Sequence, residues 1–329
     1  MNRRDLVLAL LALGASPLSG FAQQQPKMSR VGFLTPRSRP IAPNHDAFSD
    51  AFTTGMRERG YVEGRNLIVE WRYVDGQYAG LSDLAADLVR LNVEVIVAYG
   101  TAAVQAAQRA TRTIPIVIAA AVDPVGSGIV ASLSRPGGNT TGLSAIAVDL
   151  SPKHLELLKT MMPKLARVAV LTNPGNSSHA AVAKNVEAAA KGFGMEVIAA
   201  SAHTSVEIGS AFASAARARA GAVIVAGDAF FSGQGPLLAD ASVKYRMPTI
   251  SIYQEHVTAG GLMSYGQNIA DFHRQSATFV DKILKGAKPE NLPVEQPTKI
   301  DFHINGKTAK ALGIEIPQSV LIRATEVIQ

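Results

Sequence analysis

Polar, charged and aromatic side chains recur where predicted strands end, and their types suit the recognition of a small polar molecule. Hydroxyl and helix N–H groups bind a carboxylate, and an aspartate binds an ammonium group. In open α/β sheets ligands bind where parallel strands end, because helix N-termini there present free N–H groups. The candidate residues are Thr35, Ser38, Tyr99, Gly100, Thr101, Asp123, Asn173, Asn176, Asp228, Phe230 and Tyr253.

These candidates divide into two kinds of ligand contact. Gly100, Thr101 and Thr35 are placed to donate to a carboxylate, while Asp123 or Asp228 would accept from an ammonium group. The aromatic side chains that would flank the rest of the ligand are Tyr99, Phe230 and Tyr253. The pattern therefore predicts a site for an amino acid or a related zwitterion.

Most candidates also have a simpler structural explanation. Ser38 and Thr101 are suitable helix caps, residues 173–176 are suited to a turn, and Phe230 is suited to a core position. A carboxylate at the end of a buried strand is costly without a partner. The two aspartates are therefore the strongest candidates, although capping the following helix would explain either one.

Searches for catalytic and metal-binding patterns give no match. The chain has no G-x-S-x-G, no H-E-x-x-H, no phosphate-binding loop ending in G-K-[ST], and no G-x-G-x-x-G after its first predicted strand. The seven histidines lack the i, i+4 spacing that places two ligands on one helix face. We predict that most of them are surface residues, and that the protein has no catalytic residue, no metal site and no cofactor.

The two halves of the chain contain similar segments in the same order. RVGFLTP (30–36) returns as RVAVLTNP (167–174), VIVAYG (95–100) as VIVAGD (223–228), and IPIVI (114–118) as MPTISI (247–252). Repeats separated by more than about 50 residues indicate duplicated domains rather than stacked small units. The chain is therefore predicted to form two similar lobes with a cleft between them.

Apolar strand patterns alternate with helical patterns through both halves, which predicts an α/β fold of two doubly wound lobes with parallel sheets. Predicted strands span 29–35, 66–73, 93–98, 114–121 and 140–145, then 168–172, 196–200 and 222–226. Predicted helices span 46–59, 81–91, 102–110 and 126–133, then 153–162, 179–193, 206–218 and 237–245.

Three further elements follow after the second lobe is complete. The segments 249–252 and 260–266 and the helix 269–284 are predicted to return to the first lobe. We predict a signal peptide over 1–22, a first lobe of 29–140 plus 252–288, and a second lobe of 141–251 plus 289–329. The lobes would be joined by a multi-strand hinge at 140–145, 247–252 and 291–298.

The N-terminal residues predict export. A basic segment (2–4), an apolar segment (6–13) and small residues at 20 and 22 are typical of a signal peptide cleaved after Ala22. The paired arginines suit either general secretion or the twin-arginine route. The absence of cysteine excludes disulfides and a lipoprotein anchor, so a free periplasmic protein is expected. The net charge of +6 is moderate and its basic residues are scattered, which argues against nucleic-acid binding.

Several longer motifs resemble one known family. They are GYVEGRN (60–66), IPIV (114–117), DPV (123–125), SRPGGNTTG (134–142), LTNP (171–174) and AGGLMSYG (259–266). Together they resemble the ABC-transporter substrate-binding proteins of the type I periplasmic-binding fold, relatives of the tryptophan and aromatic amino-acid binding proteins. The resemblance implies two lobes, three hinge crossings, a small ligand held between the lobes, and no enzymatic activity.

The predicted function is therefore that of the extracytoplasmic solute-binding component of an ABC importer. Its partners would be a small-molecule ligand and a membrane permease, and it would act as a monomer. One alternative is a ligand-sensing regulator of the same fold, but the signal peptide occupies the place of a DNA-binding domain. Another is an exported α/β enzyme, which would need a nucleophile and base that the sequence does not reveal.

Overall fold

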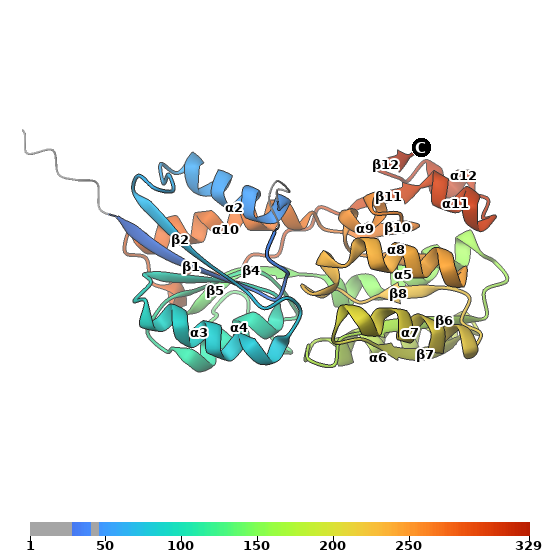
Figure 1. Cartoon of the computed structure of the whole chain (residues 1–329), viewed down its shortest axis with the longest axis horizontal. Helices are drawn as coiled ribbons and strands as arrows, with labels where there is room; N and C mark the ends of the chain where they lie inside the picture. The colour runs from blue at the N-terminus through green and yellow to red at the C-terminus, as the bar shows by residue number, and fades with distance from the viewer. Residues whose placement is uncertain (1–27, 41–45) are drawn as a thin grey trace, which may run out of the picture.

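The computed structural model describes residues 28–40 and 46–329. The predicted signal peptide and His45 lie outside these residues. Two α/β bodies lie side by side along the longest axis of the molecule (Figure 1). One contains a five-stranded sheet and the other a seven-stranded sheet, and we call them with their helices the first lobe and the second lobe. The predicted α/β fold with two mainly parallel sheets is confirmed.

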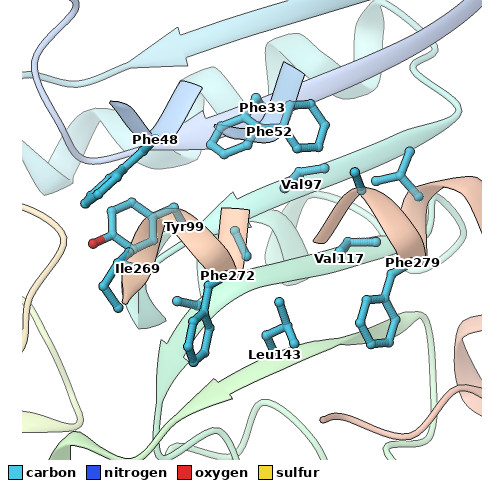
Figure 2. Packing of buried hydrophobic residues seen from close by; sticks show 14 of the residues in the cluster. Phe33, Phe48, Phe52, Val97, Tyr99, Val117, Leu143, Ile269, Phe272 and Phe279 are labelled. Atoms are coloured by element: carbon cyan, nitrogen blue, oxygen red, sulfur yellow. The ribbon is translucent and has the colours of Figure 1, made fainter. Parts of the chain in front are cut away.

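The first lobe has a sheet of strand order β2-β1-β3-β4-β5 in which every neighbouring pair is parallel. Its strands are β1 (Ser29–Thr35), β2 (Leu67–Tyr73), β3 (Val95–Tyr99), β4 (Ile116–Val122) and β5 (Thr140–Ala145). Buried side chains of α2 (Ala47–Glu58) and α10 (Ile269–Leu284) cover one face (Figure 2). The opposite face is covered by α3 (Leu81–Arg90) and α4 (Thr101–Ala110), so the sheet is doubly wound.

The second lobe has the strand order β12-β11-β10-β9-β8-β6-β7, with β10 and β11 antiparallel. Its strands are β6 (Arg167–Thr172), β7 (Glu196–Ser201), β8 (Val223–Val225), β9 (Thr249–Ser251), β10 (Met263–Gly266), β11 (Asp301–Asn305) and β12 (Glu326–Ile328). Its helices are α5 (Ala147–Met161), α6 (His179–Gly192), α7 (Ser205–Arg217), α8 (Gly235–Tyr245), α9 (Gln254–Thr258), α11 (Gly306–Leu312) and α12 (Gln318–Leu321). One core contains side chains of α5 and α6, and the other contains side chains of α7 and α8.

The helix predicted over 126–133 is wrong, because these residues form turns. The Asp123 side chain accepts a hydrogen bond from the Gly126 N–H at 2.9 Å, which closes a turn. Gly128 then has φ +71°, a left-handed conformation that interrupts a helix. The aspartate and the glycines of this segment therefore specify turns rather than a helix.

The sheet topology also corrects the predicted placement of the late segments. β9 pairs with β8, and β10 pairs with β9, so both strands belong to the second lobe and only α10 returns to the first. The predicted hinge at 247–252 is consequently wrong. β5, which was predicted to begin the second lobe, pairs with β4 in the first lobe. Apart from these placements, the domain boundaries stay predictions.

The chain passes between the two sheets at three points, and one side chain contacts all three. The crossings lie after β5, between β10 and α10, and between η3 (Pro289–Asn291) and β11. Gln267 in the second crossing accepts from the Ile146 N–H of the first at 2.9 Å and donates to the Pro297 carbonyl of the third. The third crossing also pairs with β5, because Ser144 N–H donates to the Glu295 carbonyl at 2.8 Å. The crossings thus form one connected hinge.

Candidate functional site

A small cavity lies where the first and second lobes meet. Its lining combines strand ends, helix starts and hinge residues of both lobes: Tyr99, Gly100, Thr101, Ala120, Val122, Ala145, Asn176, Gly227, Asp228, Ala229, Ile252, Tyr253 and Ile269. The space that the centre of a water molecule can reach is about 20 Å³. That is room for about one water molecule.

The first-lobe side of the cavity is formed by the turn from β3 into α4. Gly100 has φ +90°, and a Cβ at this position would lie 2.8 Å from the Cβ of Ala229 in the second lobe. Glycine therefore permits both the turn and the close approach of the lobes. Thr101 begins α4, and its hydroxyl donates to the Val122 carbonyl at 3.2 Å. The first N–H groups of a helix have no partner within it and carry partial positive charge, so this end of the cavity suits an anion.

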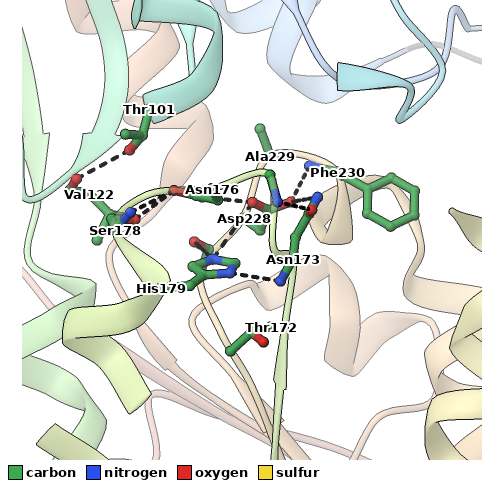
Figure 3. A network of polar contacts seen from close by, with 12 residues as sticks. Thr101, Val122, Thr172, Asn173, Asn176, Ser178, His179, Asp228, Ala229 and Phe230 are labelled. Carbon is green, nitrogen blue, oxygen red and sulfur yellow. Dashed lines mark hydrogen bonds and ion pairs between the residues drawn. The ribbon is translucent and has the colours of Figure 1, made fainter. Parts of the chain in front are cut away.

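The second-lobe side is organised by Asp228, which is buried and follows β8 (Figure 3). Its Oδ2 accepts from Asn176 Nδ2 at 2.7 Å, and its Oδ1 accepts from the Phe230 N–H at 3.0 Å. Asn173 Nδ2 is 3.5 Å from the same Oδ1. The hydroxyl of Tyr78, from the first lobe, donates to Oδ1 at 2.7 Å. Several donors thus stabilise the carboxylate in place of water.

A buried histidine, His179, contacts both Asn173 and Asp228 and helps to hold them in place. The Asn173 N–H donates to His179 Nδ1 at 2.8 Å, so Nδ1 is an acceptor and the proton of the neutral ring is on Nε2. That Nε2 is 3.2 Å from the Gly227 carbonyl and 3.6 Å from Asp228 Oδ2. Asn176 Oδ1 accepts from the N–H and the hydroxyl of Ser178, which turns its Nδ2 toward Asp228. The loop after β6 is therefore built to hold the carboxylate.

Two tyrosines form the aromatic part of the cavity lining. Tyr99 lies at the end of the first-lobe aromatic cluster, edge-on to Phe48, and its hydroxyl points away from the cluster (Figure 2). Among the described residues this buried hydroxyl has no hydrogen bond of ordinary length and angle. Burial raises the pKa of Tyr99, an effect that the nearby Arg37 guanidinium partly offsets. Burial also raises the pKa of Tyr253. Both hydroxyls therefore stay protonated at neutral pH.

The structure brings six of the predicted site residues together in the cavity lining: Tyr99, Gly100, Thr101, Asn176, Asp228 and Tyr253. Asn173 lies directly behind, in contact with Asp228. Phe230 contributes its N–H to the Asp228 network, while its ring belongs to the second-lobe core.

The remaining three candidates lie elsewhere. The Thr35 hydroxyl accepts from the Arg37 N–H at 3.2 Å, and Ser38 is exposed. Asp123 lines a different hollow near Ser144 and uses its carboxylate in the turn described above. Of the two aspartates, only Asp228 is thus placed to contact a ligand in the cavity.

The prediction of surface histidines is wrong for five of the seven. The buried ones are His154, His179, His256, His273 and His303. Burial lowers the pKa of three of them, His154, His256 and His273, to about 4, which keeps their rings neutral. Within the described part of the chain no group of three or more histidine, cysteine, aspartate or glutamate residues is arranged to hold a metal ion.

Comparison with known proteins identifies the family. The sequence profile of the ABC transporter substrate binding protein family matches residues 41–328, which is most of the chain. The chain belongs to this family. It is consequently a substrate-binding protein and not an enzyme, as the sequence motifs predicted. None of the helices among the described residues is long and apolar enough to cross a membrane.

Individual relatives cover most of the chain at moderate identity. A tyrosine-binding protein of Clostridioides difficile (strain R20291) is 27% identical over 274 residues, which are 83% of this chain and 78% of that protein. A Streptococcus pneumonia ABC domain solved with L-Trp is 26% identical, with a TM-score of 0.82 over 92% of this chain and 100% of that one. A Clostridium difficile substrate-binding protein with adhesive properties, solved ligand-free and open, is 25% identical, with a TM-score of 0.61 over the same shares.

These similarities and the contacts between the lobes describe a closed arrangement. The protein is more similar to the complex with L-Trp than to the ligand-free, open structure. Side chains of the two lobes contact each other directly, through Tyr78 and Asp228 and, at the rim, through Gln105 Nε2 and Ser177 Oγ at 3.1 Å. The cavity is therefore enclosed by two lobes in contact.

Proposed function

We propose that this protein is the periplasmic solute-binding component of an ABC importer and that it binds an amino acid or a related zwitterion between its lobes. It acts as a monomer and delivers the ligand to a membrane permease, whose ATPase is a separate chain. The observation that carries the proposal is the polarity of the cavity, which has a helix N-terminus on one side and a buried aspartate on the other.

The ligand's two charges match these two sides. Its carboxylate is bound by N–H groups at the start of α4 and by the hydroxyl of Tyr99, which has no hydrogen bond of ordinary geometry within the described chain. Its ammonium group is bound by Asp228. Tyr253, Ile252 and Ile269 contact the rest of the ligand. The relatives named for tyrosine or solved with L-Trp support an amino acid as ligand.

The size of the cavity sets a condition on binding. About 20 Å³ of space for water centres is far less than any amino acid requires. The ligand therefore reaches its site when the lobes move apart, and the bound form is less tightly closed or has Tyr99 and Tyr253 in other rotamers. Large ligands require a larger rearrangement than small ones.

A thermal-shift screen of amino acids, small carboxylates and nucleosides tests the proposal. A ligand that binds only the native state raises stability by RT ln(1 + [L]/Kd), about 2.7 kcal/mol at a hundredfold excess over Kd. We expect at least one amino acid to raise Tm, and we expect its decarboxylated amine and its N-acetyl derivative to have no effect. A response only to uncharged or anionic compounds contradicts a zwitterionic ligand.

The proposed compartment has a separate test. If the signal peptide is cleaved after Ala22, the exported protein begins at Gln23. We expect the intact mass of protein from the periplasm to match residues 23–329. A mass that includes Met1, or that shows an attached lipid, would contradict this processing.

A further inference from the structure

Tyr78, which is not among the predicted site residues, connects the two lobes directly. It begins the short 3-10 helix η1 (Tyr78–Gly80) of the first lobe, just after β2. Its ring packs against the buried clusters of both lobes, those around α3 and α4 and those around α7 and α8. Its hydroxyl reaches 2.7 Å from Asp228 Oδ1 in the second lobe. One side chain thus contributes both apolar and polar contact across the cleft.

The second lobe has a glycine where this ring is inserted. A Cβ on Gly175 would lie 2.9 Å from Tyr78 Cδ2, closer than real Cβ contacts allow. Gly175 is not in the left-handed region, so alanine is compatible with its backbone; its closest conflict would be with the inserted ring, and Asn173 Oδ1 would follow at 3.3 Å. The surface of the second lobe is therefore shaped to receive Tyr78.

The neighbouring residue Gly76 shows the same fit from the other side. A Cβ on Gly76 would lie 2.5 Å from Phe230 Cδ2, so the turn before η1 packs directly on the second lobe. Gly76 N–H donates to the Pro36 carbonyl at 2.8 Å, which fixes this turn to the end of β1. The segment that carries Tyr78 is thus rigidly attached to the first lobe, and its contacts with the second lobe are lost when the lobes separate.

We propose that Tyr78 is a positioning residue for lobe closure, which holds Asp228 and stabilises the closed form without contacting the ligand. The proposal rests on the proposed function, since closure matters only if a ligand is captured. Its test does not require the ligand to be known, because the contacts of Tyr78 join protein to protein.

The hydrogen bond between Tyr78 and Asp228 is of a kind that stabilises the closed form. Burial and the Asp228 charge raise the pKa of Tyr78 well above its usual value, so the hydroxyl keeps its proton and remains a donor. A hydrogen bond to a carboxylate is worth more than one between neutral groups, and its loss changes an equilibrium by about tenfold or more. In the open form, water hydrogen-bonds to both Tyr78 and Asp228. Loss of the bond between them therefore changes the equilibrium between the open and closed forms and not the folding of either lobe.

Two variants test the proposal by different means. Tyr78→Phe keeps the ring and removes the hydrogen bond, while Gly175→Ala keeps the hydroxyl and blocks insertion of the ring. The matched controls are Tyr245→Phe on α8 and Gly192→Ala at the end of α6, where an added Cβ would meet nothing within 4 Å. All four are single small changes, and the controls lie away from the cavity.

The readout is the distance between the lobes in the absence of ligand. The two labelling sites are Arg90→Cys in α3 and Val206→Cys in α7, because both residues are exposed. The chain has no cysteine of its own, so the dyes attach at these two sites, and single-molecule energy transfer between them measures the distance between the lobes. We expect a measurable closed fraction in the otherwise unchanged protein. We expect both Tyr78→Phe and Gly175→Ala to lower the ratio of closed to open molecules about tenfold or more, with unchanged urea midpoints of the lobes.

Each possible result decides the question. A closed fraction in Tyr78→Phe equal to that of the Tyr245→Phe control overturns the proposal, and so does an otherwise unchanged protein with no measurable closed form. A loss of closure in Tyr78→Phe together with a lowered urea midpoint also overturns it, because the residue would then act on folding. Failure of the ligand screen would remove the proposed function and leave this measurement unaffected.

Discussion

Replacement of Gln267 should destabilise the hinge far more than its position in a connecting segment suggests. The side chain is 5% exposed and hydrogen-bonds the backbone of both other crossings, at Ile146 N and the Pro297 carbonyl. The change to examine is Gln267→Ala, which removes both bonds and leaves a backbone donor and a backbone acceptor unpaired at Ile146 and Pro297, which are half-buried. Neither group has another partner of ordinary geometry within the described hinge.

The expected magnitude follows from these two groups. A buried donor or acceptor left without a partner costs about 1–3 kcal/mol, so the pair should cost about 2–5 kcal/mol once partial access of water is allowed for. Total stabilities of about 5–15 kcal/mol make this a large fraction.

Urea unfolding at neutral pH measures the effect. The matched control is Gln296→Ala in the third crossing, because Gln296 is exposed and the hydrogen bond that its side chain makes within the described chain, to Ser144 Oγ, is 3.4 Å long. We expect the control to change the free energy of unfolding by less than about 0.5 kcal/mol. A Gln267→Ala variant as stable as the control would refute the reasoning, since it would show that the crossings do not depend on this side chain.

Two further outcomes follow from charged and titratable groups. Asp228→Asn is expected to weaken binding of the amino acid found by the screen at least about tenfold, whereas Asp123→Asn should bind unchanged; calorimetric titration distinguishes them, and equal losses would contradict the assignment. His154, His256 and His273 have pKa values of about 4, below the usual 6.5, because they are buried. The free energy of unfolding should have its full value above pH 6.5 and fall as the pH drops toward 4, by about 3 kcal/mol per histidine, because only the unfolded chain binds protons on these rings in that range. A free energy of unfolding that is equal at pH 7 and pH 4.5 would contradict this.

The fold was largely predictable because local patterns and tertiary structure agree in most of the chain. The runs at 95–98 and 223–225 are fully apolar, as strands covered on both faces must be, and both became central strands. The start of α2 was equally clear, since Asp46 caps this helix through the Phe48 N–H as its residue type suggests. Such elements are determined by short-range pattern alone. The start of α5 was not clear, because this helix begins at Ala147 and was predicted from residue 153.

The late segments were misplaced because local pattern does not specify a pairing partner. β9 and β10 have strand patterns that suit either sheet. What decides is the burial of Leu262 and Met263 in the second-lobe core together with pairing to β8 and β11, which are distant in sequence. Only the long apolar face of α10, which packs on α2, takes the chain back to the first lobe.

The position of the site was predictable from the sequence, but the set of residues that form it was less so. Asp123 and Asp228 both follow buried strands, and one sequence does not distinguish them. The difference arises because Gly126 supplies a local N–H to the first, whereas the second also accepts from donors of two other segments, Tyr78 and the loop with Asn176. Tyr78 was missed because it stands in a polar turn, and its role depends on the other lobe. His179 gave a single signal, its place six residues after Asn173 at the start of α6.

The full hydrogen bonding of Asp228 restricts how an ammonium group binds there. An ionised carboxylate offers about four acceptor positions, and three are taken by short bonds from Tyr78, Asn176 and the Phe230 N–H, at 2.7, 2.7 and 3.0 Å. Two of these bonds reach Oδ1, so the remaining position is on Oδ2, where the longer contact of His179 Nε2, at 3.6 Å, is the easiest to replace. An ammonium group that takes this position binds while Tyr78 remains in place, so ligand binding and lobe closure reinforce each other. One that needs the position of Tyr78 would instead compete with closure, which is the opposite of what capture requires.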